Sequence, residues 1–270
     1  MKTTYFYSIV ALFVLMGNLV SAQTSVFIAP EIGIHSSRNE VTGDLDISDE
    51  FQGMSVDYSG IFSYQGGIGL GIQIADRWGF MTGLKYNRKG GKLTVETRDP
   101  NNQFLVTQED GTQSLDVGEV EQISTFNFLS VPLLLRAQFG NKLKVGLAIG
   151  PQFNLGMGKY TVSTEYNLES TNLPDEEEEL SYGESTSNTF KKNHVSLLVL
   201  PYVSYELNPK SSIRLSAMFE RGGDMVNDSF VVPTADGTGS RNVNGTSRNH
   251  QFGMMISYEY RFELNIGTKY

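Results

Sequence analysis

The chain has 270 residues and combines 28 glycines, 13 tyrosines and 16 phenylalanines with no cysteine. It carries 21 Lys and Arg against 30 Asp and Glu, a formal net charge of −9, and its mean hydropathy is −0.23. The absence of cysteine excludes a disulfide scaffold, a thiolate metal site and a cysteine nucleophile. The acidic balance argues against a general nucleic-acid binder, and the low hydropathy argues against a bundle of membrane helices. The many glycines and aromatic residues favour short strands and turns.

The first 22 residues have the pattern of a secretory signal peptide. Lys2 precedes an apolar run from Tyr5 to Met16, and the small residues Val20-Ser21-Ala22 resemble a cleavage site. The run is too short to span a bilayer comfortably, and a buried N-terminal helix is the less favoured alternative. We therefore predict a signal peptide over 1–22 and one mature barrel domain over 23–270.

Eight segments of the mature chain alternate between apolar and small or polar residues with period 2, which is typical of strands. Three connections between them are tight turns, at 75–77, 140–142 and 208–211, and four are long, at about 36–60, 92–124, 161–192 and 222–248. Alternating short and long connections predict an up-and-down antiparallel sheet with all long loops at one end. The eight segments are Ser25–His35, Ile61–Ile74, Trp78–Lys89, Phe126–Phe139, Leu143–Leu155, Val195–Leu207, Ile213–Arg221 and Phe252–Phe262.

The alternation favours a transmembrane barrel over a soluble one. The small and polar side of each strand carries the charged residues, whereas the apolar side carries aromatic residues near the strand ends, as in the two aromatic girdles of a membrane barrel. Glycines on the inner side make room for long charged side chains, because eight strands enclose a lumen just wide enough for side chains to fill. We predict an all-β, eight-stranded antiparallel transmembrane barrel with four long outer loops, three short periplasmic turns and a filled lumen. The inner charges are Lys85, Arg136, Lys144, Glu206, Arg214, Glu220, Glu259 and Arg261.

Charge is divided between the two ends of this barrel. The four long connections together have a net charge of −17, and the rest of the chain has +8. The densest acidic run is Asp175–Glu179. It is interpreted either as a cation-binding loop or as a solvated acidic loop, and the absence of an Asp-x-Asp-x-Asp-Gly spacing favours the second.

Three stretches resemble the PorT-type outer-membrane β-barrel proteins. Phe128–Arg136, with a proline before several leucines and a basic residue, resembles the fourth-strand motif of that family, and the glycine-rich Val145–Pro151 and the start at Ser25–Ile34 also fit. The resemblance extends over about residues 24–262 and implies a barrel in the bacterial outer membrane. Some members are linked to a protein secretion system. The tail Glu263–Tyr270 departs from the pattern, since barrels often stop at a terminal aromatic residue.

The sequence predicts no catalytic residue, no metal site and no cofactor. Of the three histidines, His35 and His194 share the lumen side of their strands, whereas His250 shares the outward side, which argues against a joint site. We predict a monomeric, non-enzymatic Gram-negative cell-envelope protein that contacts outer-membrane lipid, binds no nucleic acid, and acts structurally or by binding through its acidic loops, with envelope proteins as possible partners. The alternatives are a subunit of an outer-membrane secretion or assembly machine, an enzyme with a site at the rim, and a narrow channel.

Overall fold

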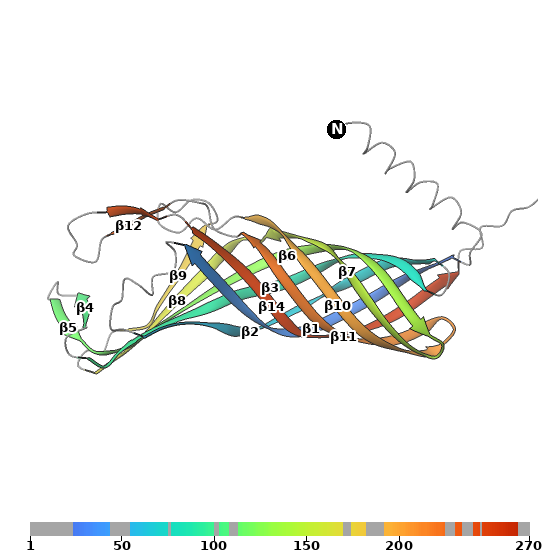
Figure 1. Cartoon of the computed structure of the whole chain (residues 1–270), viewed down its shortest axis with the longest axis horizontal. Helices are drawn as coiled ribbons and strands as arrows, with labels where there is room; N and C mark the ends of the chain where they lie inside the picture. Colours follow the sequence, from blue (N-terminus) through green and yellow to red (C-terminus); the bar gives the residue numbers. More distant parts are fainter. Residues whose placement is uncertain are drawn as a thin grey trace, which may run out of the picture.

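The computed structural model describes residues 24–43, 55–74, 77–99, 103–107, 113–169, 174–181, 192–224, 230–233, 240–243 and 245–263. Almost all of these residues lie in antiparallel strands, as the period-2 pattern predicts (Figure 1). No helix in the described ranges is both long and apolar enough to cross a membrane. The predicted signal peptide over 1–22 and the tail after Glu263 lie outside the described residues.

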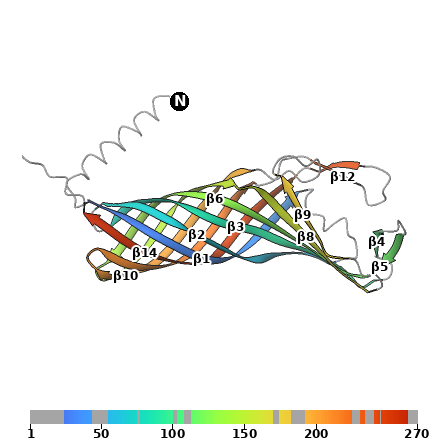
Figure 2. The same cartoon turned by 180° about the vertical axis from the view of Figure 1, so that it is seen from behind.

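The long strands pair in one closed series. Pairing leads from β1 through β2, β3, β6, β7, β10 and β11 to β14, and β14 pairs with β1 again. Figures 1 and 2 show this closed sheet from opposite sides, with its strands inclined to the long axis. The strands are β1 (Thr24–Gly43), β2 (Ser55–Ile74), β3 (Trp78–Thr97), β6 (Gly118–Gly140), β7 (Leu143–Gly156), β10 (Asn193–Asn208), β11 (Ser211–Asp224) and β14 (Gly245–Glu263).

The tight turns lie where they were predicted, but the strands run farther at the other end. For example, β3 continues to Thr97 and β6 begins at Gly118, inside the connection that was expected to be a loop over 92–124. The prediction of long loops without strands was therefore wrong in part. The reason is that the outward side of each strand, which is apolar nearer the tight turns, becomes polar in these extensions, for example at Lys92, Thr94 and Glu96 of β3. The alternation that marks the membrane pattern therefore stops before the strands do.

Six shorter strands belong to the same end of the molecule. β8 (Lys159–Leu168) pairs with the first part of β6, and β9 (Glu176–Ser181) pairs with β8. The hairpins β4–β5 (Phe104–Thr107 and Gln113–Asp116) and β12–β13 (Phe230–Pro233 and Ser240–Val243) form separate two-stranded sheets. Figures 1 and 2 show both hairpins beyond the end of the closed sheet that is opposite the tight turns.

The closed sheet is apolar outside, and its interior holds charged and polar side chains together with a cluster of buried apolar ones such as Phe27, Met81 and Leu198. Ile32, Phe62 and Met254, on the outward side of their strands, are 63%, 70% and 53% exposed, whereas Lys85 and Arg214, on the inward side, are each 1% exposed. The outward aromatic residues near the tight turns are also exposed, and they form the girdle that the sequence predicts. They are Trp78, Phe80, Phe139, Tyr205, Tyr260 and Phe262.

Glycine is required where an inward side chain crosses a neighbouring strand. A Cβ built on Gly146 would overlap the ring of Tyr202 and lie 2.6 Å from the Ala137 carbonyl oxygen. Real Cβ atoms do not approach backbone oxygen so closely, so β7 and its neighbours would have to separate. A Cβ on Gly66 of β2, in contrast, meets only the Glu31 carbonyl oxygen, at an ordinary 3.6 Å.

We therefore expect Gly146→Ala to lower the free energy of unfolding by about 1–3 kcal/mol, the usual cost of overpacking. Gly66→Ala is the matched control and is expected to be neutral or slightly stabilising, because alanine is less flexible than glycine in the unfolded chain. Denaturant titration of the refolded chain in lipid vesicles measures both. Equal stability of the two variants would contradict the packing described for Gly146.

Candidate functional site

Five charged side chains form a continuous chain of ion pairs across the interior, called here the central network. Lys85 Nζ lies 2.5 Å from Glu31 Oε2, and Arg214 Nη2 donates to Glu31 Oε1 at 2.7 Å. Arg214 Nη1 and Arg136 Nη1 both donate to Glu259 Oε1, each at 2.7 Å. All five side chains are at most 1% exposed. The network therefore ties together β1, β3, β6, β11 and β14 through the middle of the closed sheet.

Aromatic and amide groups complete the coordination of Arg136. Its Nε donates to the Tyr202 hydroxyl at 2.8 Å, and its Nη2 donates to Gln138 Oε1 at 2.7 Å and to Glu259 Oε2 at 3.1 Å. The guanidinium also lies over the rings of Phe27 and Tyr202, 5.0 and 5.1 Å from their centroids. Burying a charge is costly unless it is paired and hydrogen-bonded, and here every part of the guanidinium has such a partner.

A second charged cluster lies between the central network and the long-connection end, and we call it the upper cluster. Lys89 on β3 forms a fully buried ion pair with Glu220 on β11. Ser196 Oγ donates to Glu220 Oε1 at 2.6 Å, Gln152 Nε2 donates to Glu220 Oε2 at 2.9 Å, and Asn154 Nδ2 donates to Ser196 Oγ at 2.9 Å. The carboxylate of Glu220 is thus neutralised by one lysine and held by groups from β7 and β10.

Toward the long-connection end from the upper cluster, three aromatic side chains of the adjacent strands β6 and β8 pack together. Phe126, Phe128 and Tyr160 are all fully buried, and the Phe126 ring lies 6.5 Å from the Phe128 ring and 5.3 Å from the Tyr160 ring. Val162 packs against the same three residues. The two charged layers and this aromatic layer thus place buried side chains inside the sheet from its middle toward its long-connection end.

The histidines point in the directions that strand parity predicts. His35 and His194 are buried on the lumen side, whereas His250 lies at the surface with its Nε2 2.6 Å from Glu40 Oε2. His35 Nε2 donates to the Arg88 carbonyl at 3.0 Å, and the His194 ring stands edge-on to Phe128, 4.8 Å between centroids. His250 is thus separated from the other two by the wall of the sheet. Among the described residues, no group of three or more histidine or acidic side chains is arranged to hold a metal ion.

The long-connection end carries a five-stranded patch that we call the extension sheet. It consists of Ser55–Ser59 of β2, Lys92–Thr97 of β3, the start of β6, and strands β8 and β9, which pair in that order. The acidic run Glu176–Glu179, predicted as a loop, is the edge strand β9. The weak alternation of Tyr160, Val162, Thr164 and Tyr166 is the sequence signal for this sheet, and it was missed because it lies outside the apolar membrane pattern.

One face of the extension sheet is acidic. Glu96 lies opposite Glu119, and Glu121 lies opposite Glu165, so that like charges occupy neighbouring positions on adjacent strands. Two lysines lie among these carboxylates, Lys92, which pairs with Glu121, and Lys159, whose Nζ lies 3.6 Å from Glu179 Oε2. Like charges directly opposite each other weaken a sheet, so this arrangement opposes folding and favours cationic ligands. The acidic residues of this face are Asp57, Glu96, Glu119, Glu121, Glu165, Glu177 and Glu179.

Known proteins and families were compared with this architecture. A family model described as the outer membrane protein beta-barrel domain matches residues 21–191. The chain belongs to this outer-membrane β-barrel family. The protein is accordingly located in the bacterial outer membrane, as the sequence predicts.

Solved structures of other outer-membrane proteins resemble this barrel at low sequence identity. OprG from Pseudomonas aeruginosa has 13% identity and a TM-score of 0.37, covering 90% of this chain and 97% of that chain. The outer membrane protease OmpT from Escherichia coli has 10% identity and a TM-score of 0.39, covering 90% and 98%. Ail, the attachment invasion locus protein of Yersinia pestis, has 9% identity and a TM-score of 0.34, covering 88% and 99%. No curated protein matches the chain significantly.

The central network is expected to govern the stability of the barrel. Glu259→Gln leaves Arg136 and Arg214 sharing a neutral amide in a buried place, and breaking a buried ion pair costs about 3–5 kcal/mol. The matched control is Glu96→Gln, which removes both the exposed pair with Arg98 and a carboxylate opposite Glu119, and it is expected to change the free energy of unfolding by less than about 1 kcal/mol in either direction. Denaturant titration in vesicles compares the two. Similar small losses for both variants would show that the central network does not stabilise the barrel.

The extension sheet is expected to respond to acid at Glu119. Partial burial, the Glu121 carboxylate and Glu96 together raise the pKa of Glu119 above its ordinary value. A carboxyl group whose pKa is raised in the folded state binds its proton more tightly in the folded than in the unfolded chain, so the protonated form stabilises the fold. This stabilisation is present in acid and is lost as the pH rises through the raised pKa. We expect Glu119→Gln to slow amide hydrogen exchange in 118–125 and 159–168 near pH 7, and to have no effect in acid. Glu169→Gln, which removes an exposed carboxylate, is the control. An equal gain at both pH values would contradict this electrostatic account.

Proposed function

We propose that this outer-membrane protein is a monomeric, eight-stranded transmembrane barrel with a filled lumen, which acts as a rigid support for a surface-exposed acidic binding sheet. In this arrangement the tight turns face the periplasm, and the long connections with the extension sheet face outward. The exposed, outward-facing apolar side chains of the closed sheet, such as Ile32, Phe62 and Met254, form a surface that we call the apolar belt. This belt and the aromatic girdle near Trp78 support the placement, because a membrane barrel presents such surfaces to the lipid hydrocarbon and to the head-group interface.

A binding role is supported above all by the acidic face of the extension sheet. Carboxylates that lie opposite one another on paired strands weaken the sheet that carries them, so a cationic partner would relieve a cost that is built into the fold. Complementary charge also speeds the encounter between partners. The partner class that fits is a cationic protein surface or polycation outside the cell.

A non-enzymatic role is part of the same proposal. His35 and His194 are buried inside the barrel, whereas His250 pairs with Glu40 on the outside. The three histidines therefore do not line one solvent-exposed site. The closed sheet also leaves no unpaired edge within the membrane, which supports a monomer.

We further propose that the chain is a PorT-type member of its family. This rests on the stretch Phe128–Arg136, which carries Pro132 before three leucines and a basic residue in the middle of β6. Whether the barrel works alone or with a secretion machine is decided by which partners it contacts.

The direct test is site-specific photocrosslinking in intact outer membrane. A photoreactive residue in place of Glu177, on the acidic face, is expected to capture an extracellular or envelope partner. Replacement of Glu119, Glu165 and Glu179, which share that face, by glutamine is expected to abolish that product while the barrel still folds. A photoreactive residue in place of Leu105 of β4, an exposed position outside the extension sheet, is the control. Undiminished crosslinking after charge removal would refute a binding role for the acidic face.

A further inference from the structure

The three tight turns share a feature that the barrel architecture does not require. In each turn a basic residue directly precedes the next strand, namely Arg77, Lys142 or Lys210, and the side chain of each is exposed. In each turn the backbone carbonyl of that residue accepts an N–H from the neighbouring strand. Gln138 donates to Arg77 at 2.8 Å, Glu206 donates to Lys142 at 2.8 Å, and Arg261 donates to Lys210 at 2.7 Å. The same backbone anchor is thus used three times around the rim, and it holds the backbone of three basic residues in equivalent places.

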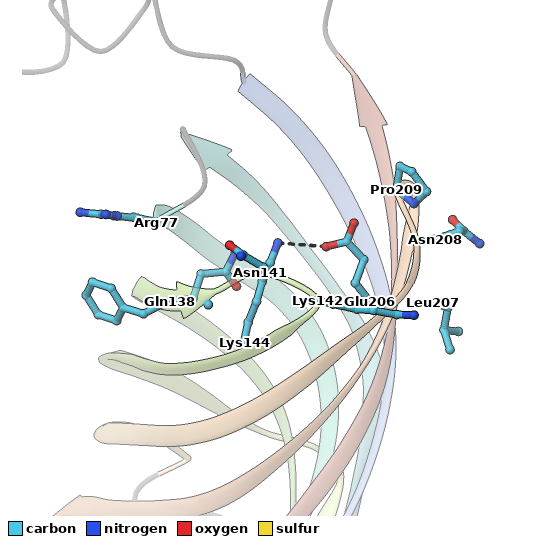
Figure 3. A pocket seen from close by; sticks show the side chains of 11 residues that line it. Arg77, Gln138, Asn141, Lys142, Lys144, Glu206, Leu207, Asn208 and Pro209 are labelled. Carbon is cyan, nitrogen blue, oxygen red and sulfur yellow. Dashed lines mark ion pairs between the residues drawn. The ribbon is translucent and has the colours of Figure 1, made fainter.

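The mouth of the barrel at this end does not account for these cations. A cavity of about 700 Å³ opens there between the turns. Its inner charge is already satisfied, because Lys144 Nζ lies 3.2 Å from Glu206 Oε2. Figure 3 shows Lys144 and Glu206 pointing toward each other, whereas Arg77 and Lys142 extend away from that pair in different directions. Arg77 and Lys142 thus line the rim of this cavity, but their side chains take no part in its ion pair.

The outer side of the rim is where lipid head groups would lie. The Lys142 ammonium lies over the ring of Tyr205, 5.4 Å from its centroid, and Tyr205 belongs to the exposed aromatic girdle. Arg77 directly precedes Trp78 of the same girdle. Tyrosine and tryptophan mark the head-group level of a membrane, so these two cations lie at the depth of lipid phosphates.

We propose that Arg77, Lys142 and Lys210 form a ring of contacts for the phosphate groups of anionic phospholipids in the leaflet around the tight turns. The inference rests on the proposed transmembrane placement of the barrel. Lysine and arginine bind phosphate through charge-assisted hydrogen bonds, and an anionic leaflet attracts basic residues near its surface. The ring thereby selects the lipids next to the barrel and holds it at a fixed depth.

The sole tryptophan of the chain, Trp78, lies beside Arg77 and reports directly on neighbouring lipid. The full mature chain is refolded in phosphatidylcholine vesicles that contain a minor, fixed fraction of lipid with brominated acyl chains, which quench tryptophan fluorescence. We expect brominated phosphatidylglycerol to quench Trp78 more strongly than brominated phosphatidylcholine at the same fraction. High salt is expected to reduce this preference, and inorganic phosphate at constant ionic strength is expected to leave it unchanged.

Variants that remove single charges distinguish binding by these three residues from a general attraction between the protein's basic residues and anionic lipid. Each of Arg77→Gln, Lys142→Gln and Lys210→Gln is expected to lower the preference for phosphatidylglycerol by up to about fivefold, from about 1 kcal/mol per basic residue. Lys159→Gln removes an exposed lysine at the opposite end and is expected to change nothing.

The possible outcomes distinguish this inference from the placement on which it rests. Equal quenching by both brominated lipids, or a preference that survives in the triple variant, overturns the phosphate ring while leaving the barrel in the membrane. Competition by inorganic phosphate at constant ionic strength also overturns it, in favour of a site for free phosphate. Absence of quenching by either lipid shows that the girdle is not in the membrane, which refutes the proposed placement itself.

Discussion

The shared carboxylate of Glu259 is the interaction on which the interior depends. It accepts hydrogen bonds from Arg136 and Arg214. Arg214 also donates to Glu31, and Glu31 in turn forms an ion pair with Lys85. In a low-dielectric interior such charges are tolerated only when they are paired and hydrogen-bonded. The central network therefore fixes the relative positions of five strands that are far apart in the sequence.

The other layers follow from the same requirement. Long side chains can meet across the lumen only where the facing strands carry no bulky side chains of their own. Glycines such as Gly146, beside Tyr202, provide that space. Polar groups of β7 and β10 surround the buried pair of Lys89 and Glu220 in the same way. These layers are the basis for proposing a filled lumen, which would suit a support for an external binding sheet better than a pore.

The two ends of the barrel have opposite charge and, we propose, opposite surroundings. At one end, carboxylates crowd on the face of the extension sheet around Glu119 and Glu121. At the other end, basic residues such as Lys142 are anchored beside the aromatic girdle. Both groups of charged side chains lie outside the apolar belt, so they keep contact with water and lose little hydration on folding. Each group therefore remains available to ligands on its own side of the membrane.

Much of this fold could be predicted because strand alternation reports which side of a strand a residue occupies. It correctly placed His35 inward and His250 outward, and the turn residues placed the three tight turns. Alternation does not show at which level along the barrel axis two inward side chains lie, because that level depends on the register of all the strands between them. The pairing of Arg214 with Glu31, 183 positions apart, was therefore not predictable. The extension sheet was missed because strands such as β8 continue beyond the belt, where apolar burial no longer marks one side.

The central claim is that paired charges and aromatic rings close the lumen. Electrical recording from the purified, refolded chain in a planar lipid bilayer tests it most directly, with insertion verified by protection of the belt from protease. The account predicts no steady conductance across a wide range of voltage. A stable, large open level in the unmodified chain would contradict it, because ions would then pass through the column that the central network, the upper cluster and the aromatic layer are described as filling.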